Sequence, residues 1–140
     1  MTNKQITLVQ HSWKLLRSLD PKVVGDVFYS RLFFTHPGLR SMFPDKMESQ
    51  HIKLIQTLNY VISRLDRIDE IDADLVAMAR RHTDYGVRSE HYPPVVEALL
   101  WTLERGLGRD WTPDTQDAWT CCLLLLSKRM QEAAKDATAA

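Results

Sequence analysis

The stretch Met78–Pro94, which reads MARRHTDYGVRSEHYPP, contains the pattern around which the rest of the chain is organised. His82 lies three residues after Ala79, so both side chains share one face of a predicted helix. Gly86 allows a turn after this helix, and Pro93 can begin another, because the backbone N–H that proline lacks would be unpaired there anyway. The imidazole of His82 is therefore expected to face the core. It is either a hydrogen-bonded structural side chain or a metal ligand held between helices.

Length and composition narrow the class of protein. The 140 residues are enough for one domain with a core that needs no disulfide or structural metal. The 18 basic residues balance the 18 acidic ones, which removes the net field that would attract nucleic acid or acidic lipid. The two cysteines, Cys121 and Cys122, are adjacent and are expected to stay reduced. The N-terminus lacks a signal-peptide run, and the longest apolar block, Cys121–Leu126, is too short to cross a membrane. We expect a cytoplasmic domain that binds neither nucleic acid nor membranes.

Apolar residues recur at helical spacing along the chain, and no alternating strand pattern, internal repeat or low-complexity block occurs. The prediction is an all-α protein of six or seven helices. An acidic linker is expected over Asp66–Asp74 and a frayed tail over Ala133–Ala140. The longer predicted helices cover Lys4–Leu19, Pro21 to the residue before Pro37, Glu48 or Ser49 to about Leu65, the segment that carries His82, Tyr92–Leu107, and Pro113 onward.

Common enzyme signatures are missing from these residues. There is no glycine-rich phosphate loop, no Gly-x-Ser-x-Gly elbow and no paired-histidine zinc motif on one helix. The other four histidines (His11, His36, His51 and His91) lie in polar stretches or at turns, and are predicted to be surface or capping residues. His82 differs because of the apolar face it occupies.

The order of several residues along the chain resembles that of globins. It is most similar to single-domain bacterial globins related to the haem domain of flavohaemoglobins. The resemblance covers nearly the whole chain and implies a single globin-like domain over residues 1–140, with six to eight helices around a pocket for haem b. The residues that carry it are Tyr29, Pro37, Phe43, Gln50, Leu54, His82, Tyr92, Pro93 and Trp119.

The resemblance implies a role for each matching residue. His82 would be the protein's ligand to the haem iron, on the side called proximal. Phe43 would pack against the porphyrin. On the opposite, distal side, Tyr29 and Gln50 would each supply a hydrogen-bond donor to a bound gas molecule, with Leu54 one helical turn after Gln50, over the iron.

Two positions depart from the family pattern or leave an alternative open. His51 directly follows Gln50, so a shift of one residue would place an imidazole over the iron and fill its sixth position. In this family a distal polar residue is followed, three and four residues later, by an outward lysine and an inward leucine. Lys53 and Leu54 stand at these spacings from Gln50, which favours Gln50 over His51 as the distal residue. Flavohaemoglobins also carry a glutamate that supports the proximal histidine together with the tyrosine matching Tyr92. That glutamate position is Ala134 here.

Three functions follow from these observations. The resemblance implies a haem protein that binds oxygen and nitric oxide, with nitric oxide dioxygenation as an activity. No flavin- or nicotinamide-binding segment occurs in the sequence, so the reductase is expected to be a separate protein. The second function is a haem-based redox or gas sensor that acts through a partner. The third is a cofactor-free helical interaction bundle, in which His82 and Gln50 are merely structural.

Overall fold

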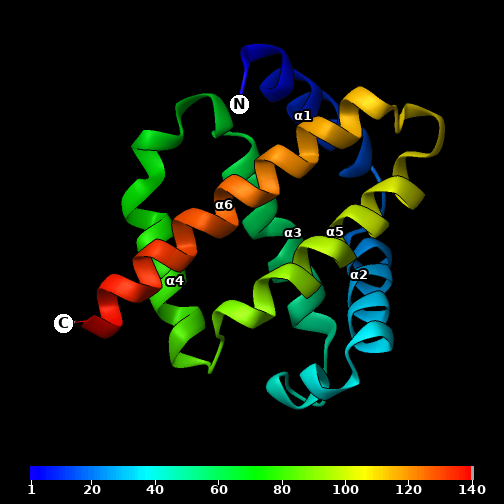
Figure 1. The fold of residues 1–140 in the computed structure, drawn as a ribbon. Coiled ribbons are helices and arrows are strands. Elements are labelled where there is room, and N and C mark those ends of the chain that lie inside the picture. Colours follow the sequence, from blue (N-terminus) through cyan, green and yellow to red (C-terminus); the bar gives the residue numbers. More distant parts are fainter. Residues whose placement is uncertain (140) are drawn as a thin grey trace.

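Six α-helices and four short 3-10 helices form the chain in the computed structural model, which describes the backbone of residues 1–139 and the side chains of residues 1–135 (Figure 1). No strand occurs within that part, and the all-α prediction is confirmed. In chain order the elements are α1 (Asn3–Leu16), α2 (Pro21–Thr35), η1 (Pro37–Met42), α3 (Glu48–Ile62), η2 (Leu65–Ile71), α4 (Asp72–Asp84), η3 (Ser89–His91), α5 (Tyr92–Leu107), η4 (Gly108–Asp110) and α6 (Pro113–Ala139).

Side-chain caps set where several helices begin. Thr2 and Gln5 form a capping box at the start of α1, in which each side chain bonds the backbone N–H of the other residue. Asp20 accepts a hydrogen bond from the backbone at the start of α2, where Pro21 occupies the first helical position. The hydroxyl of Thr112 caps α6 in the same way. These caps satisfy N–H groups that a helix leaves unpaired at its first turn.

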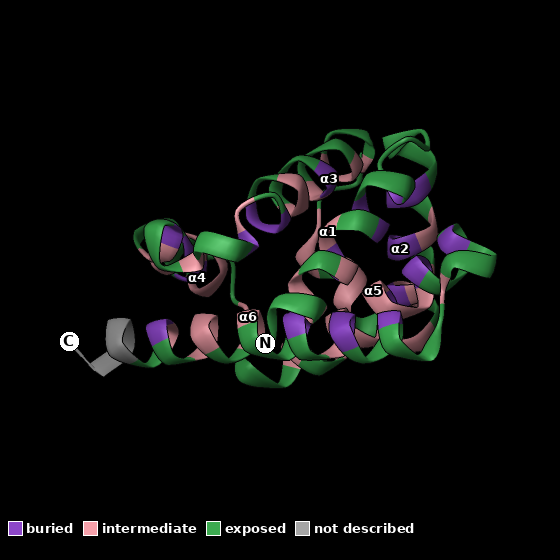
Figure 2. Ribbon diagram, turned by 90° about the horizontal axis from the view of Figure 1, so that it is seen from above, coloured by how far each residue is buried: buried purple, intermediate pink, exposed green. Residues whose placement is uncertain are grey.

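Helix α6 is the longest helix and packs against three of the others. Helix α1 packs along it, α5 contacts it as well, and α4 lies over its C-terminal part, apart from α3 (Figure 2). At the centre of the main core the rings of Trp13 and Trp119 lie 6.2 Å apart, and the indole N–H of Trp119 donates to the hydroxyl of Ser12 at 2.8 Å. A buried indole needs such a partner, so this bond fixes α1 against α6.

Two sequence predictions about helix boundaries are wrong. The acidic segment Asp66–Asp74, expected as a linker, forms most of η2 and the first residues of α4, and Ile71 within it is buried. The tail expected to fray from Ala133 instead continues α6 through Ala139, and Ala133 is only 3% exposed. Residue 140, also part of that predicted tail, lies outside the described residues.

The corner after α4 forms where the sequence predicts it. Gly86 has a φ of +91°, a left-handed conformation that side chains with a Cβ rarely adopt. The backbone N–H of Val87 returns to the carbonyl of His82 at 2.9 Å and closes the last turn of α4. This corner leads the chain into η3 and α5, and it leaves His82 one turn from the end of its helix.

Both cysteines are free, with Cys121 exposed and Cys122 buried. Burial raises the pKa of the Cys122 thiol to about 12, so this group stays protonated. Within the described part of the chain, no helix is long and apolar enough to cross a membrane.

Candidate functional site

His82 lies on the face of α4 that packs against the rest of the protein. Leu75 and Ala79 on this face are fully buried, and His82 itself is half-buried. The Nδ1 atom of its imidazole lies 2.7 Å from the backbone carbonyl oxygen of Met78. A carbonyl only accepts hydrogen bonds, so Nδ1 is the donor, and in the neutral imidazole Nε2 then keeps its lone pair. This is the tautomer that a metal-ligating histidine adopts when its second nitrogen is held by a backbone carbonyl.

Among the side chains that the structure describes, no carboxylate bonds this imidazole. Ala134, at the position of the family glutamate, is half-buried, and the neighbouring Glu132 is exposed. Gln131 donates instead to the hydroxyl of Ser127 at 2.9 Å. Tyr92, the first residue of α5, is half-buried, and burial raises the pKa of its hydroxyl. Its side chain forms no hydrogen bond with His82 or with any other described residue.

Tyr29 lies in a cluster of aromatic rings on the inner side of α2. It is 8% exposed, and its ring contacts four others, with centroid distances of 4.8 Å to Phe28, 5.8 Å to Phe33, 5.4 Å to Phe43 and 5.5 Å to His51. Burial raises the pKa of the Tyr29 hydroxyl to about 12, which keeps it protonated. Its hydroxyl has no hydrogen-bond partner among the described residues, so it is a donor available to a ligand.

Helix α3 brings the other distal residues beside this cluster. Gln50, in the first turn of α3, is half-buried, and its amide makes no hydrogen bond within the described part of the chain. Lys53 is exposed, and Leu54 is half-buried and packs against both the main core and the Tyr29 cluster. The lysine side chain therefore faces outward and the leucine side chain inward.

Arg40 fixes the loop that carries Phe43, and sequence reasoning did not single it out. Its guanidinium donates to the carbonyl oxygens of Phe43, Pro44 and Asp45 at 3.3, 2.9 and 2.9 Å. Because one side chain donates to three backbone carbonyls, the turn after η1 is held in place. Phe43 at this turn packs against Tyr29 in a T-shaped arrangement. An arginine in a short polar turn gives no signal in the sequence that it will do this.

His51 is the prediction that the structure corrects. The sequence predicts a surface or capping histidine, but the side chain is half-buried and lies against Tyr29 with the ring planes 20° apart. The three remaining histidines agree with the prediction. His11 and His36 are exposed, and Nδ1 of His91 accepts the backbone N–H of Arg88 at 2.9 Å.

The side chains available as metal ligands suit a metal that is already bound within a macrocycle. The described residues contain no group of three or more His, Cys, Asp or Glu side chains that could hold a bare ion. One free imidazole nitrogen, with apolar surroundings, matches haem iron, which needs only an axial ligand. Apolar side chains that stay half-buried are also suited to packing against a flat ring. They include Leu54 and Leu99, shared by the main core and the Tyr29 cluster, and Met78 and Leu126, beside the buried face of α4.

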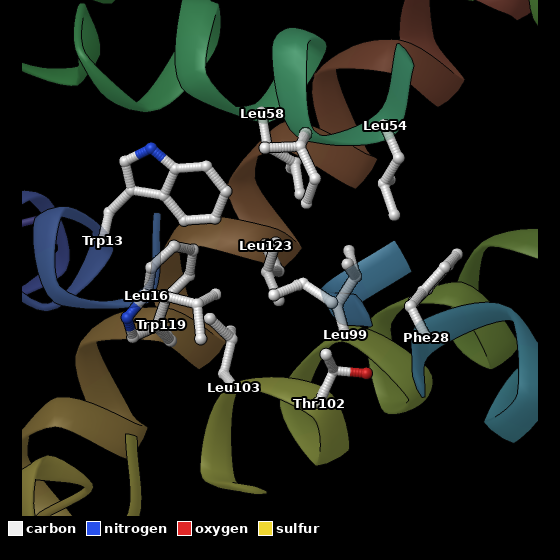
Figure 3. Close-up of a pocket in the computed structure, with 12 residues that line it drawn as sticks. Trp13, Leu16, Phe28, Leu54, Leu58, Leu99, Thr102, Leu103, Trp119 and Leu123 are labelled. Carbon is white, nitrogen blue, oxygen red and sulfur yellow. The ribbon is translucent and has the colours of Figure 1, made fainter. Parts of the chain in front are cut away.

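A separate small cavity lies within the main core (Figure 3). Its volume is about 10 Å³, enough for no more than roughly one water molecule. Leu54 and Phe28 form its wall toward the Tyr29 cluster, and Trp13, Trp119 and Leu123 line it farther in. It is too small for a macrocycle, so it is not the cofactor site.

The fold and the site together define a class, that of all-α proteins with a globin fold. The structure aligns with a bacterial globin from Campylobacter jejuni at a TM-score of 0.87, covering 99% of this chain and 100% of that one at 20% sequence identity. The family model named Globin matches residues 26–130, and the chain belongs to the globin family. Membership of this family places it among haem-binding, gas-binding proteins.

Curated relatives include both short and long proteins. The chain is 28% identical over 122 residues to a flavohemoprotein of Bacillus subtilis, covering 85% of this chain and 30% of that protein. A flavohemoprotein of Vibrio cholerae is 25% identical over 131 residues, with 33% of its length covered. Neuroglobin-1 of Oncorhynchus mykiss is 27% identical over 133 residues, with 83% of its length covered. The chain thus spans about a third of the flavohemoproteins it matches.

Proposed function

We propose that this globin binds haem b through Nε2 of His82, binds oxygen and nitric oxide, and converts the two to nitrate when a separate reductase supplies electrons. The observation that carries the proposal is the 2.7 Å hydrogen bond from Nδ1 of His82 to the carbonyl of Met78. It leaves the other nitrogen unprotonated on a helix whose inner face is apolar. The two free cysteines support a reducing, cytoplasmic setting.

When bound, haem supplies an iron centre that binds diatomic gases and exchanges electrons with them. The chain's own contribution is to hold the cofactor and to stabilise the bound gas. Phe43 and Leu54 offer apolar surface to the macrocycle. The hydroxyl of Tyr29, protonated and without a protein partner, and the amide of Gln50 can each donate to a gas molecule that carries partial negative charge.

On the proximal side, a backbone carbonyl and not a carboxylate at residue 134 contacts the imidazole of His82. A carboxylate on Nδ1 would draw its proton and make the imidazole more basic, whereas a backbone carbonyl leaves it neutral. Since Ala134 provides no carboxylate, His82 donates less electron density than a charged partner would allow. We therefore expect this site to bind dioxygen reversibly when nitric oxide is absent.

The proposed reaction combines one nitric oxide, one dioxygen and one electron into one nitrate ion. Both oxygen atoms of dioxygen are kept, and the nitrogen is oxidised. The pocket contributes orientation, because two donors hold dioxygen while nitric oxide reaches it. The electron comes from a flavin reductase that uses a nicotinamide donor.

The first test is haem binding by purified protein. We expect a Soret band and one haem per chain in the wild type, and loss of most haem in His82→Ala. His36→Ala is the matched control, because His36 is exposed. Wild-type haem content in the His82 variant would refute the ligand assignment. No Soret band in the wild type, even after reconstitution, would favour the cofactor-free bundle.

The second test addresses the reaction. Reduced, oxygenated protein mixed with nitric oxide in a stopped-flow instrument should produce nitrate in a single stoichiometric burst and then stop. Adding a flavin reductase and a nicotinamide donor should restore turnover. A protein that binds both gases yet yields no nitrate would refute the dioxygenase proposal and leave gas binding or sensing.

A further inference from the structure

We propose that His51 is a positioning residue for the distal site: its imidazole packs against Tyr29 and holds that phenol in the orientation from which its hydroxyl donates to a bound gas. This rests on the proposed function, because it concerns the same pocket. It also assigns His51 a role other than the sixth ligand or a surface residue.

The first step is the contact between α2 and α3. A Cβ atom built at Gly25 would lie 2.6 Å from the Cβ atom and 2.8 Å from the Cα atom of His51. Both distances are shorter than ordinary contacts, so the two backbones touch at this point and only glycine fits. The Cβ atom of His51 is therefore fixed against α2.

The second step follows from helical spacing. Tyr29 lies four residues after Gly25, which places it one turn along on the same face of α2. The imidazole of His51 extends from the crossing along this face and meets the Tyr29 ring, with centroids 5.5 Å apart and planes 20° apart. This offset, nearly parallel arrangement is one that aromatic pairs prefer.

The third step is that, among the described residues, His51 is the one whose ring links Tyr29 to α3. Phe28 and Phe33 belong to α2 itself, and Phe43 follows η1. Gln50, the other proposed donor, is the residue immediately before His51. The stack therefore sets the positions of both donors relative to each other, because one residue joins the helices that carry them.

The ring of His51 acts here through its flat shape. Neither of its nitrogens forms a hydrogen bond with the described residues, so no polar contact competes with the stack. A phenylalanine should therefore replace it, and an aliphatic residue should not. This distinguishes positioning by packing from iron ligation, which needs a nitrogen.

The experiment compares His51→Phe with His51→Ala. With haem bound, oxygen should dissociate about two- to ten-fold faster from the alanine variant, the size expected for loss of one aromatic pair. The phenylalanine variant should stay near the wild-type rate. In a Tyr29→Phe background the alanine substitution should have no further effect, since the donor it positions is absent. If His51→Ala does not fold, His51→Leu removes the flat ring and keeps apolar bulk.

A second readout needs no haem. In haem-free protein with labelled tyrosine, the NMR signals of the Tyr29 ring, assigned with Tyr29→Phe, should shift in His51→Ala and keep near wild-type positions in His51→Phe. Equal oxygen dissociation rates in wild type and His51→Ala would overturn the inference. So would a six-coordinate ferrous spectrum in the wild type that His51→Phe abolishes. Failure of the wild type to bind haem would instead refute the proposed function.

Discussion

Replacing Gly25 by alanine should destabilise the protein, although alanine is the better helix former. The new methyl carbon would lie 2.6 Å from the Cβ atom of His51, where ordinary contacts are 3.4–4 Å. Helices α2 and α3 would therefore have to separate by roughly 1 Å, since carbon atoms pack best at about 3.5–4 Å. Overpacking of this kind costs about 1–3 kcal/mol. Alanine returns about 0.5–1 kcal/mol through its helix propensity, so the net loss lies between roughly 0 and 2.5 kcal/mol, with about 1–2 kcal/mol expected for contacts this short.

Urea denaturation of the haem-free protein, followed by circular dichroism, measures this difference without any contribution from the cofactor. Gly38→Ala is the matched control. It lies in η1, and no atom comes within 4 Å of a Cβ built there. The control should be neutral or slightly stabilising. A Gly25→Ala protein as stable as the wild type would show that the two helices do not touch at His51.

Three further outcomes are expected. Ser12→Ala removes the partner of the buried Trp119 indole and should lower the free energy of unfolding in urea by about 1–3 kcal/mol. Hydrogen bonds from Arg129 lower the pKa of Asp72 in the folded protein below its ordinary value of 3.8. The pair therefore stabilises the folded state above pH 3.8, and this stabilisation is lost as the pH falls through the lower folded pKa. Asp72→Asn should therefore flatten the acid limb of an unfolding curve measured against pH. Tyr29→Phe, which keeps the ring and removes the donor, should speed oxygen dissociation about ten-fold or more in flash photolysis or stopped flow. An unchanged rate would refute the distal role.

Much of the fold could be predicted because it is encoded locally. Apolar spacing identified the helices, and the Asp20-Pro21 pair marked the start of α2. Gly86 marked the corner, where its φ of +91° requires a residue without a Cβ. The inner face of α4 also followed from spacing, since Leu75 and Ala79 are buried as expected. These features depend on neighbours within one helical turn, which is the range over which a sequence pattern carries information.

The remaining features depend on contacts between distant segments. His51 sits in a polar stretch, and only the crossing with Gly25 shows that its ring enters the site. The signal available in the sequence is Gly25, one helical turn before Tyr29. It indicates a close contact with another helix but does not identify the residue that makes this contact. The acidic segment is read as a linker because Ile71, its buried residue, stands among charged side chains and fits no α-helical stripe. Ala133 was assigned to a frayed tail because a small side chain gives no sign of the surface that covers it.

The hydrogen bond between Ser12 and Trp119 has a consequence for synthesis of the chain. It joins residues 107 positions apart, so the surface of α1 that packs against α6 has no native partner until α6 has left the ribosome. Closing so long a loop also delays this contact relative to those within α2, η1 and α3. During translation the first helix therefore depends on temporary cover, from the nascent chain itself or from a chaperone. The native core closes only when the last helix emerges.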